Sequence, residues 1–189
     1  MRNLLIFLVV SVAVLAFGNI AEASLYVFTP SDADLADMPH GNAFLWGMKK
    51  VIPANESIIG ASIFINDINN WQVENDILYM RLINTATTGV RTYSDNEAAG
   101  DYFSGRGTYL TSYADNNHYR NRYGQWVNPA EDWTYDFTSS QLDALRSYAQ
   151  DSMFGLSFDP DCHYYNNGVT FTIETTHTPD SKKIGRAHV

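Results

Sequence analysis

The sequence predicts a mainly β protein, an antiparallel β-sandwich of jelly-roll type with one short helix. Aromatic residues are abundant, with 12 Tyr, 10 Phe and 4 Trp in 189 residues, and such side chains favour strands. Asparagine and aspartate are frequent between the apolar runs, where they favour turns. The apolar runs are short and regularly interrupted by turn residues. A chain of this length suffices for one domain with its own core.

Alternating apolar side chains predict seven to nine short strands. The clearest is at residues 57–65, where Ile59, Ala61 and Ile63 share one face of the strand by the two-residue period. Residues 115–121 are polar and predict a loop. The other expected strands are 25–28, 40–48, 76–83, 89–93, 107–113, 154–158 and 169–174.

A single helix is expected at residues 139–151. Thr138 is suited to the N-cap and Gln141 to the third helical position, which together form a capping box. Phe137 and Leu142 occupy the two positions of a hydrophobic staple. About three helical turns follow, and we expect them to cover one end or edge of a sheet.

Both ends of the chain are expected to lie outside the folded domain, which spans residues 24–180. Residues 1–23 combine Arg2, an apolar stretch and a final Ala-Glu-Ala, the pattern of a cleavable signal peptide. The protein is therefore expected to be secreted or located at the cell surface. Residues 181–189 end in Ile-Gly-Arg-Ala-His-Val, which matches the translation of a common sequencing adapter. We expect this segment to be an artefact rather than part of the fold.

The predicted domain is strongly acidic. Residues 24–180 hold 20 acidic and 8 basic side chains, a net charge of −12. Nucleic acid is disfavoured as a partner, because binding phosphates requires basic clusters. No membrane span is expected after the signal peptide. Cys162 is the only cysteine, so no intrachain disulfide forms, and a buried thiol is the simplest expectation.

Two pairs of aspartates suggest a calcium site. Asp32 and Asp34 lie near the start of the domain, and Asp159 and Asp161 lie near its end. Calcium binds six to eight oxygen atoms, and the first and last strands of a sandwich often lie side by side. The alternative, which is the more common reason for aspartate in loops, is that these residues only form turns.

Four aromatic residues suggest a platform for sugar rings. Tyr123, Trp126, Trp133 and Tyr135 lie close together in the sequence, and carbohydrate-binding sandwiches use such rings to stack on sugars. The alternative is that these large side chains fill the core of the sandwich. Exposure of the two tryptophans would distinguish the two interpretations.

Two segments resemble exported bacterial proteins. Residues 52–65, IPANESIIGASIFI, resemble an I-P-A-G-x-x-I pattern of secreted β-sandwich modules, with Asn55 in place of the glycine. Residues 154–175 are similar to a segment of uncharacterised exported bacterial β-sandwich proteins that often carry a PEP-CTERM sorting tail. The tail itself is not present in this sequence. The resemblance implies export and an association with the cell surface or with exopolysaccharide.

These observations favour a secreted or surface-associated, non-enzymatic protein with a structural or adhesive role, stabilised by calcium if the aspartate site forms. Extracellular polysaccharide or other cell-surface components are the expected partners. The second hypothesis is a carbohydrate-binding module. A secreted hydrolase ranks third, because Glu131, Asp132 and Asp136 offer carboxylates without any spacing that fixes a catalytic pair.

Overall fold

The computed structural model describes residues 23–30, 35–74, 76–96 and 99–177. As predicted, the protein is mainly β, and every strand pair among these residues is antiparallel. The first sheet has the order β1 (Ala23–Phe28), β13 (Val169–His177), β4 (Glu56–Asn70), β12 (Tyr164–Tyr165) and β2 (Asp37–Met38), and β10 (Glu131–Asp136) also pairs with β4. The second sheet has the order β6 (Gly89–Ser94), β3 (Asn42–Lys49), β11 (Met153–Pro160), β5 (Ile77–Ile83) and β7 (Thr108–Ala114).

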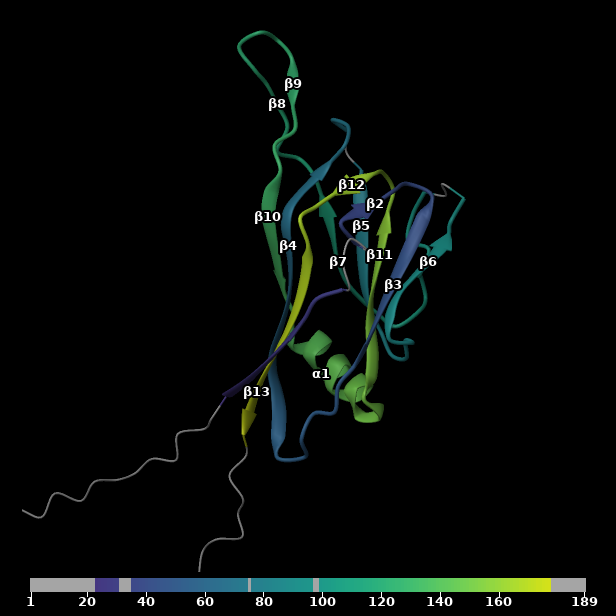
Figure 1. Cartoon of the computed structure of the whole chain (residues 1–189), viewed down its shortest axis with the longest axis vertical. Coiled ribbons are helices and arrows are strands. Elements are labelled where there is room, and N and C mark those ends of the chain that lie inside the picture. Colours follow the sequence, from purple (N-terminus) through teal and green to yellow (C-terminus); the bar gives the residue numbers. More distant parts are fainter. Residues whose placement is uncertain (1–22, 31–34, 75, 97–98, 178–189) are drawn as a thin grey trace, which may run out of the picture.

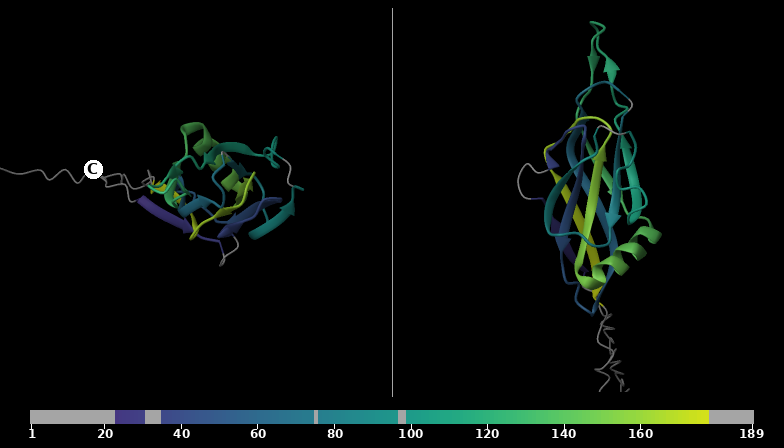
Figure 2. Two further views of the ribbon diagram at one scale, coloured as in Figure 1. Left: turned by 90° about the horizontal axis from the view of Figure 1, so that it is seen from above. Right: turned by 90° about the vertical axis from the view of Figure 1, so that its right-hand side faces the viewer.

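The two sheets lie face to face and enclose the core (Figure 1 and Figure 2). Phe154 of the second sheet is fully buried and contacts Phe28 and Phe171 of the first. At the other end of the core, Tyr113 of the second sheet packs edge-on against Tyr164 of the first. Aromatic contacts of this kind bury large apolar areas, which explains how the domain closes without a disulfide. The jelly-roll topology stays a prediction, since this strand order does not establish it.

The strand predicted at residues 57–65 is confirmed and is longer than expected. It forms β4, which continues to Asn70 and pairs with β13, β10 and β12. Ala61, Ile63 and Ile65 are buried on one face, but the prediction that Ile59 shares this face is wrong. Ile59 is exposed and Ile58 is buried instead, because the pairing with β13 shifts register between Gly60 and Ile58. The sequence analysis did not predict β10, although its residues alternate between partly buried and exposed with the two-residue period of a strand.

The predicted helix is confirmed as α1 (Ser139–Tyr148), followed by the 3₁₀ turn η2 (Ala149–Asp151). The backbone N–H of Thr138 donates to Gln141 Oε1 at 2.8 Å, as the capping box requires. Gln141 Nε2 also donates to the carbonyl of Leu110 at 2.8 Å, so the first turn of the helix is fixed to β7. Leu145 is fully buried on the side facing the core.

One hairpin projects from the end of the sandwich opposite to α1 (Figure 1 and Figure 2). Its strands are β8 (Tyr119–Arg120) and β9 (Trp126–Val127), which pair only with each other among the described residues. A loop was predicted over residues 115–121, so the chain is more ordered here than expected. In the described part of the chain, no helix has the length and the apolar character that crossing a bilayer requires.

Candidate functional site

The projecting hairpin presents three exposed aromatic side chains. Tyr119, Tyr123 and Trp126 are 52%, 70% and 51% exposed. Large aromatic rings on one protruding element offer flat apolar faces to a partner, while the body of the domain buries most of its own. We call residues 118–127 the aromatic hairpin.

The tip of the aromatic hairpin is held by its own side chains. Asn121 Oδ1 accepts hydrogen bonds from the backbone N–H groups of Tyr123 at 2.9 Å and Gln125 at 3.1 Å. Gly124 has a φ of 77°, in the left-handed region that glycine adopts without strain. Asparagine before a turn and glycine at its left-handed position are the residue types that this turn requires. The tip is therefore preorganised.

Two arginines give the aromatic hairpin a positive charge. The guanidinium of Arg120 lies 4.4 Å from the centre of the Trp126 ring, and that of Arg122 lies 4.7 Å from the centre of the Tyr123 ring. These are cation–π distances. Residues 116–130 contain no acidic side chain, although the predicted domain as a whole carries −12. Neither arginine was predicted as a site residue, although their alternation with aromatic residues in YRNRY is visible in the sequence.

The four residues of the predicted sugar platform are divided between two places. Tyr123 and Trp126 lie on the aromatic hairpin and are exposed. Trp133 and Tyr135 lie on β10, where their rings are nearly parallel, 9° apart, with centres 6.0 Å apart. Both rings are partly buried and pack against the core, and the Tyr135 hydroxyl donates to the carbonyl of Leu110 at 2.8 Å.

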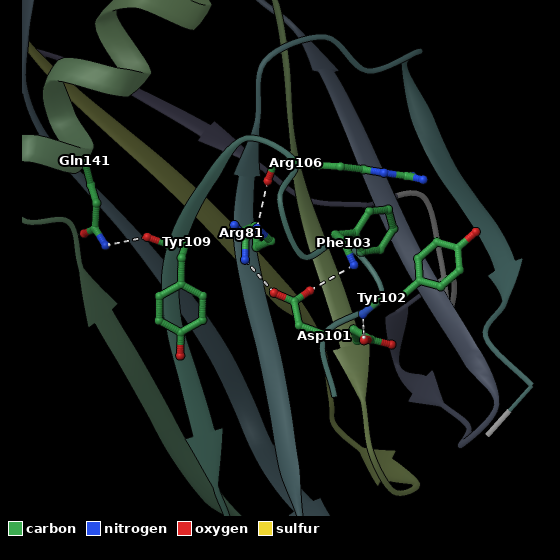
Figure 3. Close-up of polar contacts among 8 residues, drawn as sticks. Arg81, Asp101, Tyr102, Phe103, Arg106, Tyr109 and Gln141 are labelled. Carbon is green, nitrogen blue, oxygen red and sulfur yellow. Dashed lines mark hydrogen bonds and ion pairs between the residues drawn. The ribbon is translucent and has the colours of Figure 1, made fainter. Parts of the chain in front are cut away.

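A second cluster of polar contacts holds the loop between β6 and β7. Arg81 donates from Nη1 to Asp101 Oδ2 at 2.6 Å and from Nε to the carbonyl of Arg106 at 2.8 Å. Asp101 Oδ1 accepts from the N–H of Phe103 at 2.9 Å (Figure 3). The side chains of Arg81 and Asp101 are only 13% and 11% exposed. The pair therefore anchors the loop from beneath rather than facing a ligand.

The same loop accounts for two of the predicted calcium ligands. Asp159 Oδ2 accepts from the N–H of Tyr102 at 2.5 Å, and Asp161 Oδ1 accepts from the N–H of Gly100 at 2.9 Å. Asp159 is 1% exposed, and its Oδ1 atom has no hydrogen-bond partner. The other two predicted ligands, Asp32 and Asp34, lie outside the described residues, so the four-aspartate site stays a prediction.

Asp159 is expected to make stability depend on pH. Burial raises its pKa to about 7 from 3.8, the hydrogen bond from Tyr102 opposes the shift, and the nearby carboxylates of Asp95, Asp101 and Asp161 add to it. The folded state therefore binds a proton more tightly than the unfolded state. The resulting stabilisation is complete below about pH 4 and is lost as the pH rises through about 7.

We expect Asp159→Asn to be more stable than the unsubstituted protein at pH 8, by about 1–3 kcal/mol, and to show a smaller loss between pH 4 and pH 8. Urea unfolding at both pH values measures the difference. Asp143→Asn, at an exposed helix position, is the matched control and should reproduce the unsubstituted profile. Identical pH profiles for Asp159→Asn and the unsubstituted protein would contradict the prediction.

Three of the groups that a hydrolase could use make other contacts in this structure. Cys162 is buried, and burial together with Asp76 raises the pKa of its thiol to about 11, which disfavours the nucleophilic thiolate. His163 is hydrogen-bonded to Asp37. Among the predicted carboxylates, Glu131 accepts from the Tyr113 hydroxyl at 2.9 Å and is thus engaged in packing.

Within the residues that the structure describes, no three side chains of the types His, Cys, Asp and Glu are gathered so that they could hold a metal ion. No protein-family model matches the chain, and no curated protein matches it. The geometry alone therefore distinguishes the candidate sites, and the aromatic hairpin is the one that faces solvent.

Proposed function

We propose that this chain is an exported, non-enzymatic β-sandwich protein with an adhesive role, which contacts acidic extracellular polysaccharide through its aromatic hairpin. The observation that carries the proposal is the exposure of Tyr119, Tyr123 and Trp126 on a preorganised element that projects from the domain. The signal-peptide pattern of residues 1–23 supports export.

The chemistry of the aromatic hairpin suits a sugar polymer that carries carboxylates. Tyrosine and tryptophan faces stack on the apolar faces of pyranose rings. Arg120 and Arg122 offer planar guanidinium groups, which bind carboxylates through two parallel hydrogen bonds. The acidic remainder of the domain repels the same polymer, so contact would be restricted to the aromatic hairpin.

Affinity electrophoresis through gels with and without polygalacturonate tests the proposal. We expect the polymer to retard the protein and added salt to weaken the retardation, because exposed charges are screened. Replacing both aromatic residues, Tyr123→Ala with Trp126→Ala, should weaken binding by about tenfold or more. Replacing both arginines, Arg120→Gln with Arg122→Gln, should remove most of the salt dependence.

Tyr109→Ala is the matched control, because Tyr109 is 45% exposed but lies near the opposite end of β7 from the aromatic hairpin. This variant should bind like the unsubstituted protein. The proposal fails if the unsubstituted protein is not retarded by the polymer. It also fails if the aromatic double variant is retarded as strongly, or if Tyr109→Ala loses as much affinity.

A further inference from the structure

Three side-chain oxygens without a hydrogen-bond partner belong to residues at the place where the aromatic hairpin joins the sandwich. The structure leaves Oδ1 of Asp115, Asn117 and Asn128 buried and without a hydrogen-bond partner. Asp115 and Asn117 precede β8, and Asn128 follows β9, so these residues flank the aromatic hairpin on both sides. We call residues 115–118 and Asn128 the hairpin root. We infer that the hairpin root is a calcium-binding site formed by the three side-chain oxygens.

The orientation of the Asn128 amide is fixed by its neighbours. Its Nδ2 group donates to the carbonyl of Asn70 at 2.6 Å and to Asp115 Oδ2 at 3.0 Å. Both partners are acceptors, and turning the amide around would place oxygen against oxygen. Oδ1 of Asn128 therefore faces away from them, toward no donor in the described part of the chain.

The other two residues are constrained in the same way. Asn117 Nδ2 donates to the carbonyl of Pro129 at 3.0 Å, an atom that only accepts, so Oδ1 of Asn117 is also committed to its present direction. Oδ2 of Asp115 accepts hydrogen bonds from the backbone N–H of Asn70 at 2.7 Å and from the side-chain amide of Asn128. The other carboxylate oxygen of Asp115, Oδ1, has no partner. All three remaining atoms are acceptors.

A cation satisfies such a set better than water does. A water molecule donates two hydrogen bonds, whereas three buried acceptors need partners here. Asp115 is also 1% exposed, and among the described residues no Lys, Arg or His forms an ion pair with it. A buried carboxylate without a counter-charge is unfavourable, and a bound cation supplies that charge.

The donor types select calcium. A carboxylate and two amide carbonyls are hard oxygen ligands, and calcium accepts neutral oxygens and completes its shell with water. Zinc prefers nitrogen and sulfur, and only His118 at this root offers a nitrogen. With one formal negative charge, the site should bind calcium weakly, at the level of about 10⁻⁴–10⁻³ M that extracellular modules show.

Thermal unfolding of the full chain, in chelator and in calcium at about 10 mM, tests the inference at a concentration above the expected dissociation constant. Calcium should raise the Tm by roughly 3–10 °C, because it binds only the folded state. Asp115→Asn and Asn117→Ala should each lose this rise. In chelator, Asp115→Asn should be at least as stable as the unsubstituted protein, since it removes the uncompensated charge.

Asp159→Asn is the matched control, because Asp159 is equally buried and also has one unpartnered oxygen. It should keep the full calcium response. The inference is overturned if calcium leaves the Tm of the unsubstituted protein unchanged, or if the rise survives in Asn117→Ala. It is also overturned if Asp159→Asn, rather than the root variants, abolishes the response. None of these measurements involves polysaccharide, so the inference and the proposed function can fail separately.

Discussion

Replacing Arg81 by methionine is expected to lower the free energy of unfolding by about 2–3 kcal/mol, because Arg81 and Asp101 form an ion pair that is largely, though not fully, shielded from solvent. Asp101 would then keep an unpaired negative charge near Asp159, whose pKa the neighbouring carboxylates of Asp101 and Asp161 already raise. The carbonyl of Arg106 would lose its donor as well. Urea unfolding at pH 8 measures the effect.

The double variant Arg81→Met with Asp101→Asn separates lost charge pairing from lost packing. It removes both charges, while the asparagine oxygen can still accept from the N–H of Phe103. We expect it to recover at least half of the stability that Arg81→Met loses. If the double variant is as unstable as Arg81→Met, the aliphatic stem of the arginine matters more than its charge, and an unpaired Asp101 is not the cause of the loss.

The elements that were predictable from sequence are those with a local signal. The middle of β4 alternates with a period of two over residues 61–65, and α1 begins at a capping box. In contrast, β8 and β9 have two residues each, too few for any period to be visible. The pairing that makes them a hairpin depends on the turn at Asn121 and Gly124.

The candidate site was predictable only in part, because burial is decided by tertiary contacts. Trp126 and Trp133 are seven residues apart and have similar polar neighbours, yet only Trp126 projects into solvent. Likewise, the sequence around Asp159 and Asp161 favours a turn. In the structure, however, their carboxylates accept hydrogen bonds from a loop that lies about 60 residues earlier in the chain. Two of the three oxygens at the hairpin root belong to asparagines, and asparagine in a polar segment predicts turns more often than metal ligands.

Gly47 and Gly155 are required by the strand order of the second sheet and not by any local sequence pattern. In the second sheet, β5 and β6 are consecutive in the chain but are separated by β11 and β3. The connection at residues 84–88 must therefore cross both of these strands, a distance of about 14 Å at the usual strand spacing. At the crossing, Gly47 of β3 is paired with Gly155 of β11.

Gly47→Ala is therefore expected to destabilise the protein strongly, by about 3 kcal/mol or more. A Cβ atom at this position would lie 2.0 Å from the carbonyl oxygen of Thr87 and 2.6 Å from its carbonyl carbon. Both are backbone atoms of the short crossing segment, which cannot move away without lifting Ala86, a residue that is 2% exposed. Thermal and urea unfolding measure the change.

Gly60→Ala provides the comparison within β4, where a Cβ atom would come no closer than 3.2 Å to the flexible end of the Glu174 side chain. That carboxylate can move aside, so this substitution should change the free energy of unfolding by less than about 1 kcal/mol. A larger loss of stability in Gly47→Ala than in Gly60→Ala would then be caused by the clash with the crossing segment. It would not be caused by the replacement of a glycine in a strand. Equal changes in the free energy of unfolding for the two variants would contradict the close approach of residues 84–88 to Gly47 that the structure shows.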